Sequence, residues 1–212
     1  SKQLILYPIK DGKVSGEGKN LLEGTPYHGV MVPFGGLGDV IFIGESKVVY
    51  TTKKMTGKEF ATSTDSDLYA YDIQTGETSN LTGPYLGYDM HPRLHEKTQQ
   101  LGWLSMASEG FEADKTDIIV RDLKTQEDRN LTSTIDLTVS TFVWNNKGDK
   151  IYFIAVTEAT YQYFELDVKT GKHRQITHGD HDYRSISTLG NKLVGMKQTM
   201  LHPNELYEVD IK

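Results

Sequence analysis

The fold of this chain is decided by a stretch that reads Asp67-Leu-Tyr-Ala-Tyr-Asp72-Ile-Gln-Thr-Gly76-Glu-Thr-Ser-Asn-Leu81-Thr82. It returns as Asp117-Ile-Ile-Val-Arg-Asp122-Leu-Lys-Thr-Gln126-Glu-Asp-Arg-Asn-Leu131-Thr132, and again as Tyr163-Phe-Glu-Leu-Asp167-Val-Lys-Thr-Gly171-Lys-His-Arg-Gln-Ile176-Thr177. A truncated copy reads Glu205-Leu-Tyr-Glu-Val-Asp210-Ile-Lys212. The shared Asp stands at positions 72, 122, 167 and 210, so the copies are 50, 45 and 43 residues apart. A β-hairpin repeat of this period predicts propeller blades or a β-solenoid, because one such unit cannot bury its own apolar face.

Each full copy predicts a hairpin whose turn follows the shared Asp. Gly76 and Gly171 supply the positive φ angle that a tight turn needs. Gln126 replaces Gly in the middle copy, which should make that turn stiffer or change its type. An Asp beside a turn usually caps backbone amides, so we predict a structural role for all four recurring Asp residues.

Two copies also end in an N-glycosylation acceptor sequence, Asn80-Leu-Thr82 and Asn130-Leu-Thr132. Both acceptor sequences stand at the same position of the repeat. We therefore expect them to belong to the structure of the blade rather than to mark sites of modification.

The repeat predicts an all-β chain, a partial β-propeller of about four to five four-stranded antiparallel blades of the WD40-like or TolB-like kind. We expect a single domain over 1–212, without a catalytic α/β-hydrolase domain. Its predicted parts are a half-blade at 4–24 with a turn at Lys10–Lys13, blades at 39–82, 88–132 and 139–177, and an incomplete blade at 184–212. Neither end completes a blade, so we expect the chain to be part of a longer protein.

Composition excludes several classes of function. The net charge of −6 argues against a nucleic-acid partner, because phosphate binding needs a basic face. No apolar run approaches the roughly 20 residues of a membrane span. Cysteine is absent, which removes disulfides, thiolate catalysis and the commonest zinc sites. We expect a bacterial periplasmic or secreted location, although a cytoplasmic one also fits. Trp103 and Trp144 stand in predicted strands of successive blades, where large aromatics fill the space between sheets, so both should be buried.

The blades resemble the propeller repeats of the prolyl oligopeptidase family of serine peptidases, in particular bacterial dipeptidyl-peptidase and acylaminoacyl-peptidase-like members. The resemblance covers almost the whole chain and rests on Val32-Pro-Phe-Gly-Gly-Leu-Gly-Asp39, Gly87-Tyr-Asp-Met-His-Pro92, Leu101-Gly-Trp-Leu-Ser-Met106, Gly110-Phe-Glu-Ala-Asp114 and Thr141-Phe-Val-Trp-Asn-Asn-Lys-Gly-Asp149. It implies a propeller that caps an α/β-hydrolase domain carrying Ser, Asp and His. The nucleophile motif of that domain, Gly-x-Ser-x-Gly, does not occur in these 212 residues, so we expect no catalytic residue here and no hydrolysis by this chain alone.

The candidate substrate-binding residues are Glu112 and Asp114, in the acidic stretch Glu109-Gly-Phe-Glu112-Ala-Asp114. Dipeptidyl peptidases of the family use propeller carboxylates to bind the free amino end of a peptide. Carboxylates on a loop that faces the catalytic cleft would do so through charge-assisted hydrogen bonds. The paired-Glu helix motif of those enzymes is not visible in this chain, and the alternative is a solvated acidic loop or a carboxylate that caps a neighbouring turn.

Two further groups of residues resemble a phosphate-binding loop and a metal site, but the spacing of their residues supports neither. Phe34-Gly-Gly-Leu-Gly38 lacks the Gly-x-Gly-x-x-Gly spacing of a phosphate-binding loop, so we expect a bend before a blade. The loop after the fourth repeat gathers side chains that can bind metals, but their spacing matches no ligand pattern. These side chains are His173, His178, Asp180, His181 and Asp182. We therefore predict neither a cofactor nor a metal.

Two functions remain open. The chain is either the non-catalytic propeller of a serine exopeptidase or oligopeptidase, which restricts access and positions a peptide substrate for a missing hydrolase domain, or a TolB-like or lactonase-like propeller that binds a protein or small ligand. We also expect that Leu4–Ile9 and Leu206–Ile211 present unpaired strand edges, through which a homodimer can form.

Overall fold

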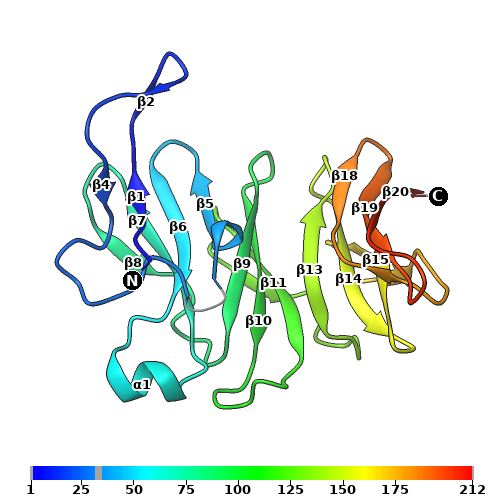
Figure 1. The fold of residues 1–212 in the computed structure, drawn as a ribbon. Coiled ribbons are helices and arrows are strands. Elements are labelled where there is room, and N and C mark those ends of the chain that lie inside the picture. The colour runs from blue at the N-terminus through cyan, green and yellow to red at the C-terminus, as the bar shows by residue number, and fades with distance from the viewer. Residues whose placement is uncertain (1, 32–34, 212) are drawn as a thin grey trace. The chain divides into compact units, whose positions relative to one another are not determined.

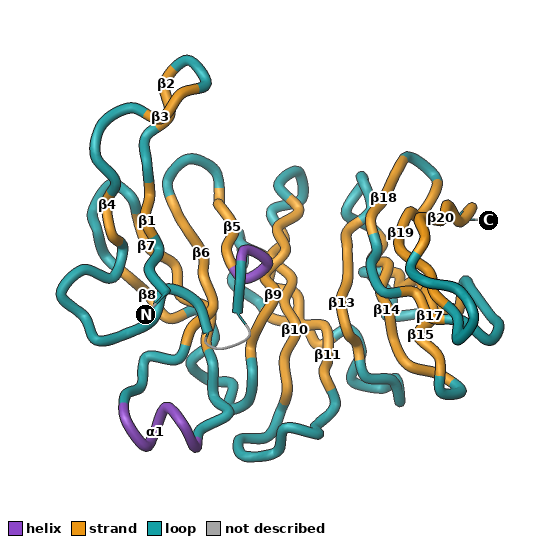
Figure 2. The backbone as a smooth tube through the Cα atoms, in the orientation of Figure 1, coloured by secondary structure: helices purple, strands orange, loops and turns teal. Residues whose placement is uncertain are grey.

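The computed structural model describes residues 2–31 and 35–211. Its regular structure is nearly all β-strand, apart from the short helix α1 (Gly57–Thr62) and the 3-10 helix η1 (Leu37–Asp39) (Figure 2). No helix of the described ranges is long and apolar enough to cross a membrane. The chain divides into two compact units. The first holds residues up to Pro92 together with Ser105–Asp114, and the second holds Arg93–Leu104 and residues from Lys115 onward.

The described residues of the first unit form three antiparallel sheets (Figure 1). Two are two-stranded and pair β1 (Ile5–Leu6) with β4 (Lys19–Asn20), and β2 (Ile9–Lys10) with β3 (Lys13–Val14). The third is a four-stranded sheet in chain order, made of β5 (Val40–Ile43), β6 (Lys47–Thr52), β7 (Asp67–Asp72) and β8 (Thr78–Asn80).

A second four-stranded sheet contributes to both units, because the division passes through β9 and β10. Its strands are β9 (Asp89–His95), β10 (Gln100–Met106), β11 (Thr116–Asp122) and β12 (Asp128–Asn130), again in chain order.

The second unit holds two further sheets. The first comprises β13 (Val139–Trp144), β14 (Lys150–Thr157), β15 (Thr160–Asp167) and β16 (His173–Gln175). The other comprises β17 (Asp182–Tyr183), β18 (Ser187–Leu189), β19 (Lys192–Gln198) and β20 (Glu205–Asp210). Both β17 and β18 pair with β19, at opposite ends of it, while β20 pairs along its length. Residues 182–189 therefore form one interrupted edge of this sheet.

The core of the first unit forms between the sheet β5–β8 and the N-terminal segment. Tyr50 and Tyr69 are register partners on β6 and β7, and their rings stack with centroids 6.0 Å apart. Leu21 and Leu22 follow β4 and pack in the same cluster of buried residues. A single sheet exposes half of its side chains, so this cover supplies the burial that the isolated hairpins lack.

In the second unit, large aromatics pack between neighbouring sheets. Trp103 on β10 is fully buried and Trp144 on β13 is 9% exposed, which confirms the predicted burial of both. Gly102 on β10 makes the close approach of Phe142 and Trp144 possible, because a Cβ at that position would lie 3.0 Å from the Phe142 ring and 3.2 Å from the Trp144 ring. Trp144 Nε1 also donates a hydrogen bond to the Arg93 carbonyl at 3.0 Å, so the indole nitrogen keeps a partner in the core.

The shared Asp of the repeat caps a turn in each full copy, as predicted. Asp72 Oδ1 accepts hydrogen bonds from the amides of Gln74 and Thr75, both at 2.9 Å. Asp122 accepts the equivalent two amide bonds in its own turn, and Asp167 accepts hydrogen bonds from the hydroxyl and the amide of Thr170. These bonds lower the pKa of all three carboxyls, since hydrogen bonding to the charged form favours it.

The Gln126 turn keeps the type of the other two. Gln126 has φ +63°, close to the +78° of Gly76 and the +70° of Gly171. Its amide donates to the Asp122 carbonyl at 2.8 Å, as the amide of Gly76 donates to Asp72 at 2.9 Å. Gln therefore adopts the left-handed conformation that Gly adopts more easily.

The Asn of each acceptor sequence has a structural partner. Asn80 Nδ2 donates to Asp67 Oδ2 at 2.8 Å, and Thr82 Oγ1 donates to Asp67 Oδ1 at 3.1 Å. The Asp117 carboxylate accepts the same two bonds from Asn130 and Thr132, at 2.9 and 2.7 Å. The side chains of each acceptor sequence thus join the last strand of a sheet to the strand before it.

Candidate functional site

The two predicted carboxylates lie on the loop between β10 and β11, in the first unit, and have different surroundings. Asp114 Oδ2 accepts a hydrogen bond from the Ser108 amide at 2.8 Å, so it joins the two ends of this loop. Glu112 is exposed, and its Oε1 accepts a hydrogen bond from the Tyr88 hydroxyl at 3.4 Å. We call residues 107–115 the acidic loop. Glu112 is the predicted residue that reaches another segment of the chain.

Hydrogen bonds hold the acidic loop against the segment that joins β6 to β7. The Gly110 amide donates to Thr64 Oγ1 at 2.6 Å, and Ser63 Oγ donates to Glu109 Oε1 at 3.3 Å. Ser63 directly follows α1, so this short helix sets the position of the contact. Two loops of different sheets are therefore fixed side by side.

Lys53 lies where these loops meet. It directly follows β6 and is only 7% exposed. Its ammonium donates a hydrogen bond to the Ser63 carbonyl and lies 5.0 Å from the centroid of the Tyr88 ring. Burial lowers the pKa of Lys53, while Glu112 and Asp65 act in the opposite direction. Burial and Glu112 together raise the pKa of the Tyr88 hydroxyl.

Asp65 is the least satisfied carboxylate of this group. Its Oδ1 is buried and accepts no hydrogen bond within the described part of the chain. Burial raises the pKa of Asp65 to about 6; Asp67 and Glu109 add to the rise, and Lys53 opposes it. A half-buried carboxylate with a free oxygen and a raised pKa is typical of a functional site.

We call Lys53, Asp65, Tyr88, Glu109 and Glu112 the acid–lysine cluster. It places two carboxylates, Asp65 and Glu112, near one ammonium group and a third, Glu109, near Asp65, beside an aromatic ring. The excess of negative charge favours a second cation, such as the free amino group of a peptide, which carboxylates bind through charge-assisted hydrogen bonds. Across residues 2–31 and 35–211 no three His, Asp or Glu side chains are placed to hold a metal ion.

The raised pKa of Asp65 gives the cluster a testable pH dependence. A raised folded-state pKa means that the contribution of Asp65 to stability is fully present below its ordinary pKa of 3.8 and is lost as pH rises through about 6. Thermal unfolding of Asp65→Asn should therefore show a melting temperature that improves, relative to the parent chain, as pH rises from 4 to 7. The control Asp72→Asn should show no such improvement between pH 4 and 7, because its carboxyl has a lowered pKa and its contribution to stability is lost only as pH falls below the ordinary pKa of 3.8. The same slope for both variants would contradict this reading of Asp65.

The remaining sequence candidates do not join the cluster. The predicted bend at 34–38 begins with Phe34, outside the described residues, and η1 follows directly before β5. In the loop after β16, Gln162 Nε2 donates to the carbonyls of Gly179 and His181, at 3.0 and 2.8 Å. The His181 ring packs edge-on against Tyr183, with centroids 5.1 Å apart. These contacts give His181 a role in packing.

Comparison with curated proteins identifies close relatives of the chain. It is 34% identical over 203 residues to Dipeptidyl-peptidase 5 of Porphyromonas gingivalis, and the match covers 95% of this chain and 30% of that protein. It is 38% identical over 197 residues to Dipeptidyl-peptidase 5 of Porphyromonas endodontalis, covering 92% of this chain and 28% of that protein. The chain thus spans slightly less than a third of the length of these relatives. No protein-family model matches it.

Solved structures confirm the fold class. The β-propeller domain of the Trilobed protease from Pyrococcus furiosus matches with a TM-score of 0.58 at 14% identity, covering 82% of this chain and 49% of that one. The acylaminoacyl peptidase of Pyrococcus horikoshii matches with a TM-score of 0.59 at 19% identity, over 81% of this chain and 25% of that chain. TolB from Acinetobacter baumannii matches with a TM-score of 0.55 at 14% identity, covering 99% of this chain and 51% of that one. The chain is an all-β partial propeller, and its resemblance to peptidase propellers is confirmed.

Proposed function

We propose that this chain, as a propeller segment of the prolyl oligopeptidase kind, helps a serine peptidase to bind the free amino end of its peptide substrate. The acid–lysine cluster would hold the amino group, and the propeller would restrict access to a hydrolase domain outside these 212 residues. The relatives that support this role are named dipeptidyl-peptidases. Their names describe those proteins, and the transfer to this chain is our inference.

One observation carries the proposal: a buried carboxylate oxygen of Asp65 has no hydrogen-bond partner among the described residues, in a cluster with more acids than bases. An unsatisfied buried acceptor costs about 1–3 kcal/mol, so a ligand that donates to it gains by relieving that cost. A protonated amine is a strong donor for this purpose. Glu112 would contribute a second, more exposed oxygen, while Asp114 would act as a positioning residue by closing the acidic loop.

The alternative role as a TolB-like binding module has weaker support. The TolB structure shares 14% sequence identity with the chain, which speaks for the fold alone, whereas the dipeptidyl-peptidases share 34% and 38%. A propeller that positions a substrate for a hydrolase requires no catalytic residue of its own. The absence of Gly-x-Ser-x-Gly from the chain is therefore compatible with the peptidase role.

The proposal is tested by Glu112→Gln in the peptidase that carries this segment. We expect KM to rise by about tenfold for a dipeptidyl substrate with a free amino end, because a charge-assisted hydrogen bond contributes about 1.5–3 kcal/mol. The same substrate with an acetylated amino end has no ammonium group, so its KM should change little. Steady-state kinetics on the matched pair of substrates gives the comparison.

The control is Glu77→Gln, which makes the same change of charge in the exposed turn between β7 and β8. It should leave both KM values unchanged. Equal effects of Glu112→Gln on the free and the acetylated substrate, or no effect on either, would mean that the acidic loop is only a solvated surface loop. Such a result would contradict the proposed amine site.

Self-association through strand edges is a further proposal about partners. The outer strand β20 carries exposed apolar side chains, Leu206 at 76% and Tyr207 at 37%, and Ile9 on β2 is 72% exposed. Open edges with apolar faces pair readily with other chains. Light scattering of the chain at micromolar concentration should give the mass of a dimer, and a monomer with ordered end strands would contradict the idea. A periplasmic or secreted location also stays a prediction.

A further inference from the structure

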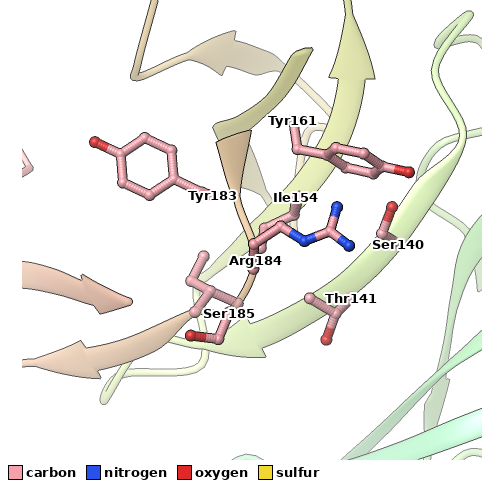
Figure 3. Close-up of a pocket in the computed structure, with 8 residues that line it drawn as sticks. Ser140, Thr141, Ile154, Tyr161, Tyr183, Arg184 and Ser185 are labelled. Carbon is pink, nitrogen blue, oxygen red and sulfur yellow. The ribbon is translucent and has the colours of Figure 1, made fainter. Parts of the chain in front are cut away.

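A pocket of about 410 Å³ opens in the second unit, where two strand edges approach each other (Figure 3). Ser140 and Thr141 reach it from β13, Tyr161 from β15, and Arg184 from the interrupted edge between β17 and β18. Ile154 on β14 is buried and contributes an apolar wall. None of these residues belongs to the acid–lysine cluster.

Arg184 brings a positive charge to this pocket that nothing in the described chain neutralises. Its backbone is fixed, since its amide donates to the Met196 carbonyl on β19 at 2.8 Å. Its side chain is exposed, and its guanidinium carbon lies 5.2 Å from the centroid of the Tyr161 ring. No Asp or Glu of residues 2–31 and 35–211 forms an ion pair with it. The nearby Asp182 carboxylate instead accepts the Tyr161 amide at 3.0 Å.

Side chains that carry hydroxyl groups lie around this guanidinium. Figure 3 shows it between the Tyr161 ring on one side and the side chains of Ser140 and Thr141 on the other. Within the part of the chain that the structure describes, none of these three hydroxyls has a hydrogen-bond partner in the protein, and Ser140 is exposed to solvent. The pocket thus contains one guanidinium group, three hydroxyl groups that can donate hydrogen bonds, and the apolar side chain of Ile154.

We infer that this pocket binds the carboxylate group of a peptide. The planar guanidinium, whose carbon lies 5.2 Å from the Tyr161 ring centroid, matches a carboxylate with two parallel hydrogen bonds. Hydroxyls can donate to the remaining lone pairs, while Ile154 and the Tyr161 ring offer apolar contact to the rest of the ligand. A volume of about 410 Å³ is at the low end for small-molecule pockets, roughly 300–1,000 Å³, and suits a short peptide rather than a folded partner.

Calorimetric titration of the full chain with short peptides tests this inference. The probe is N-acetyl-trialanine with a free carboxyl end, and its matched control is the same peptide with an amidated end. We expect the free acid to bind at least about tenfold more tightly than the amide, the ratio expected for a charged hydrogen bond of about 1.4 kcal/mol or more. Acetylation removes the amino group, so failure here would leave the proposed amine site untouched.

Two amidated peptides, Ac-Ala-Glu-Ala-NH2 and Ac-Ala-Gln-Ala-NH2, separate the possible sources of the carboxylate. Preference for the Glu peptide would assign the pocket to an acidic side chain, and preference only for the free end would assign it to the peptide terminus. Either result supports the inference. Equal binding of acids and amides, or tighter binding of inorganic phosphate than of either acid, would overturn it.

Arg184→Gln should abolish the preference for the acid, and Arg184→Lys should retain only part of it, because an ammonium cannot form the bidentate pair. Arg129→Gln on β12 is the matched control, since Arg129 is also exposed but lies outside the pocket. Circular dichroism checks that each variant is folded. A preference that survives in Arg184→Gln, or that is lost equally in Arg129→Gln, would contradict the assignment.

Discussion

Trp103→Ala is expected to lower the free energy of unfolding by about 3–5 kcal/mol, the range for removing a large buried aromatic side chain. Trp103 is fully buried on β10, and the guanidinium carbon of Arg121 lies 5.5 Å from the centroid of its ring. The substitution removes the ring from a packed interior that cannot collapse to fill the space. In a chain of this length, the loss corresponds to a melting temperature lower by roughly 10 °C.

Urea unfolding followed by far-ultraviolet circular dichroism measures this loss. The control is Phe111→Ala in the acidic loop, because the Phe111 side chain is 55% exposed and its removal should change stability by no more than about 0.5 kcal/mol. Similar small losses for both variants would mean that the buried Trp103 ring contributes little to the stability of the core.

Gly195→Ala is expected to cost about 3 kcal/mol, the upper end of the range for overpacking. A Cβ at position 195 would lie 2.0 Å from the Ser185 carbonyl oxygen and 2.1 Å from the Tyr163 hydroxyl. Tyr163 is fully buried and donates a hydrogen bond to that same carbonyl at 2.7 Å. The new methyl group would therefore push apart β19 and the edge that carries Ser185, and would break a buried hydrogen bond.

The comparison is Gly36→Ala, where a Cβ would meet nothing within 4 Å and the backbone is extended, with φ −158°. That variant should stay within about 0.5 kcal/mol of the parent chain. Retention of full stability by Gly195→Ala would show that the edge between β17 and β18 can move aside, and would weaken the geometry assigned to the nearby Arg184 pocket.

The repeat predicts the strands well because its evidence is local. The sequence predicts a hairpin around the turn after each shared Asp, and the structure pairs β7 with β8 and β11 with β12 there. The caps at Asp72, Asp122 and Asp167 follow from the chemistry of a carboxylate beside a turn. These features depend on residues a few positions apart, which a repeat displays several times over.

The candidate site could be predicted only in part, because it depends on contacts between loops. Glu112 is predicted from the acidic stretch, whereas Lys53 and Asp65 carry no motif and stand far from it in the sequence. Tyr88 belongs to the stretch Gly87–Pro92, which carries the family resemblance but predicts no contact with Glu112. The raised pKa of Asp65 comes from burial, which no local pattern reveals. Helix α1 lies in the same connection between strands and was not expected either.

The role of Arg184 in the second unit could not be predicted either, because it also depends on contacts between distant segments. The sequence places Arg184 at the start of an incomplete blade and gives it no special role. Residues between β17 and β18 have no register partner on β19, and Arg184 lies among them. The pocket forms where these residues approach β13, the first strand of the neighbouring sheet. An interruption of this kind depends on packing between sheets and leaves no signature in the repeat.

We propose that this propeller segment serves a serine peptidase, and active-site labelling tests that role most directly. Antibodies against the segment would isolate the polypeptide that carries it from its natural source, after treatment with a fluorophosphonate that labels activated serines. We predict one polypeptide that contains both this segment and a labelled Ser in a Gly-x-Ser-x-Gly motif outside residues 1–212. Isolation of the segment on a polypeptide without a labelled serine would contradict the account.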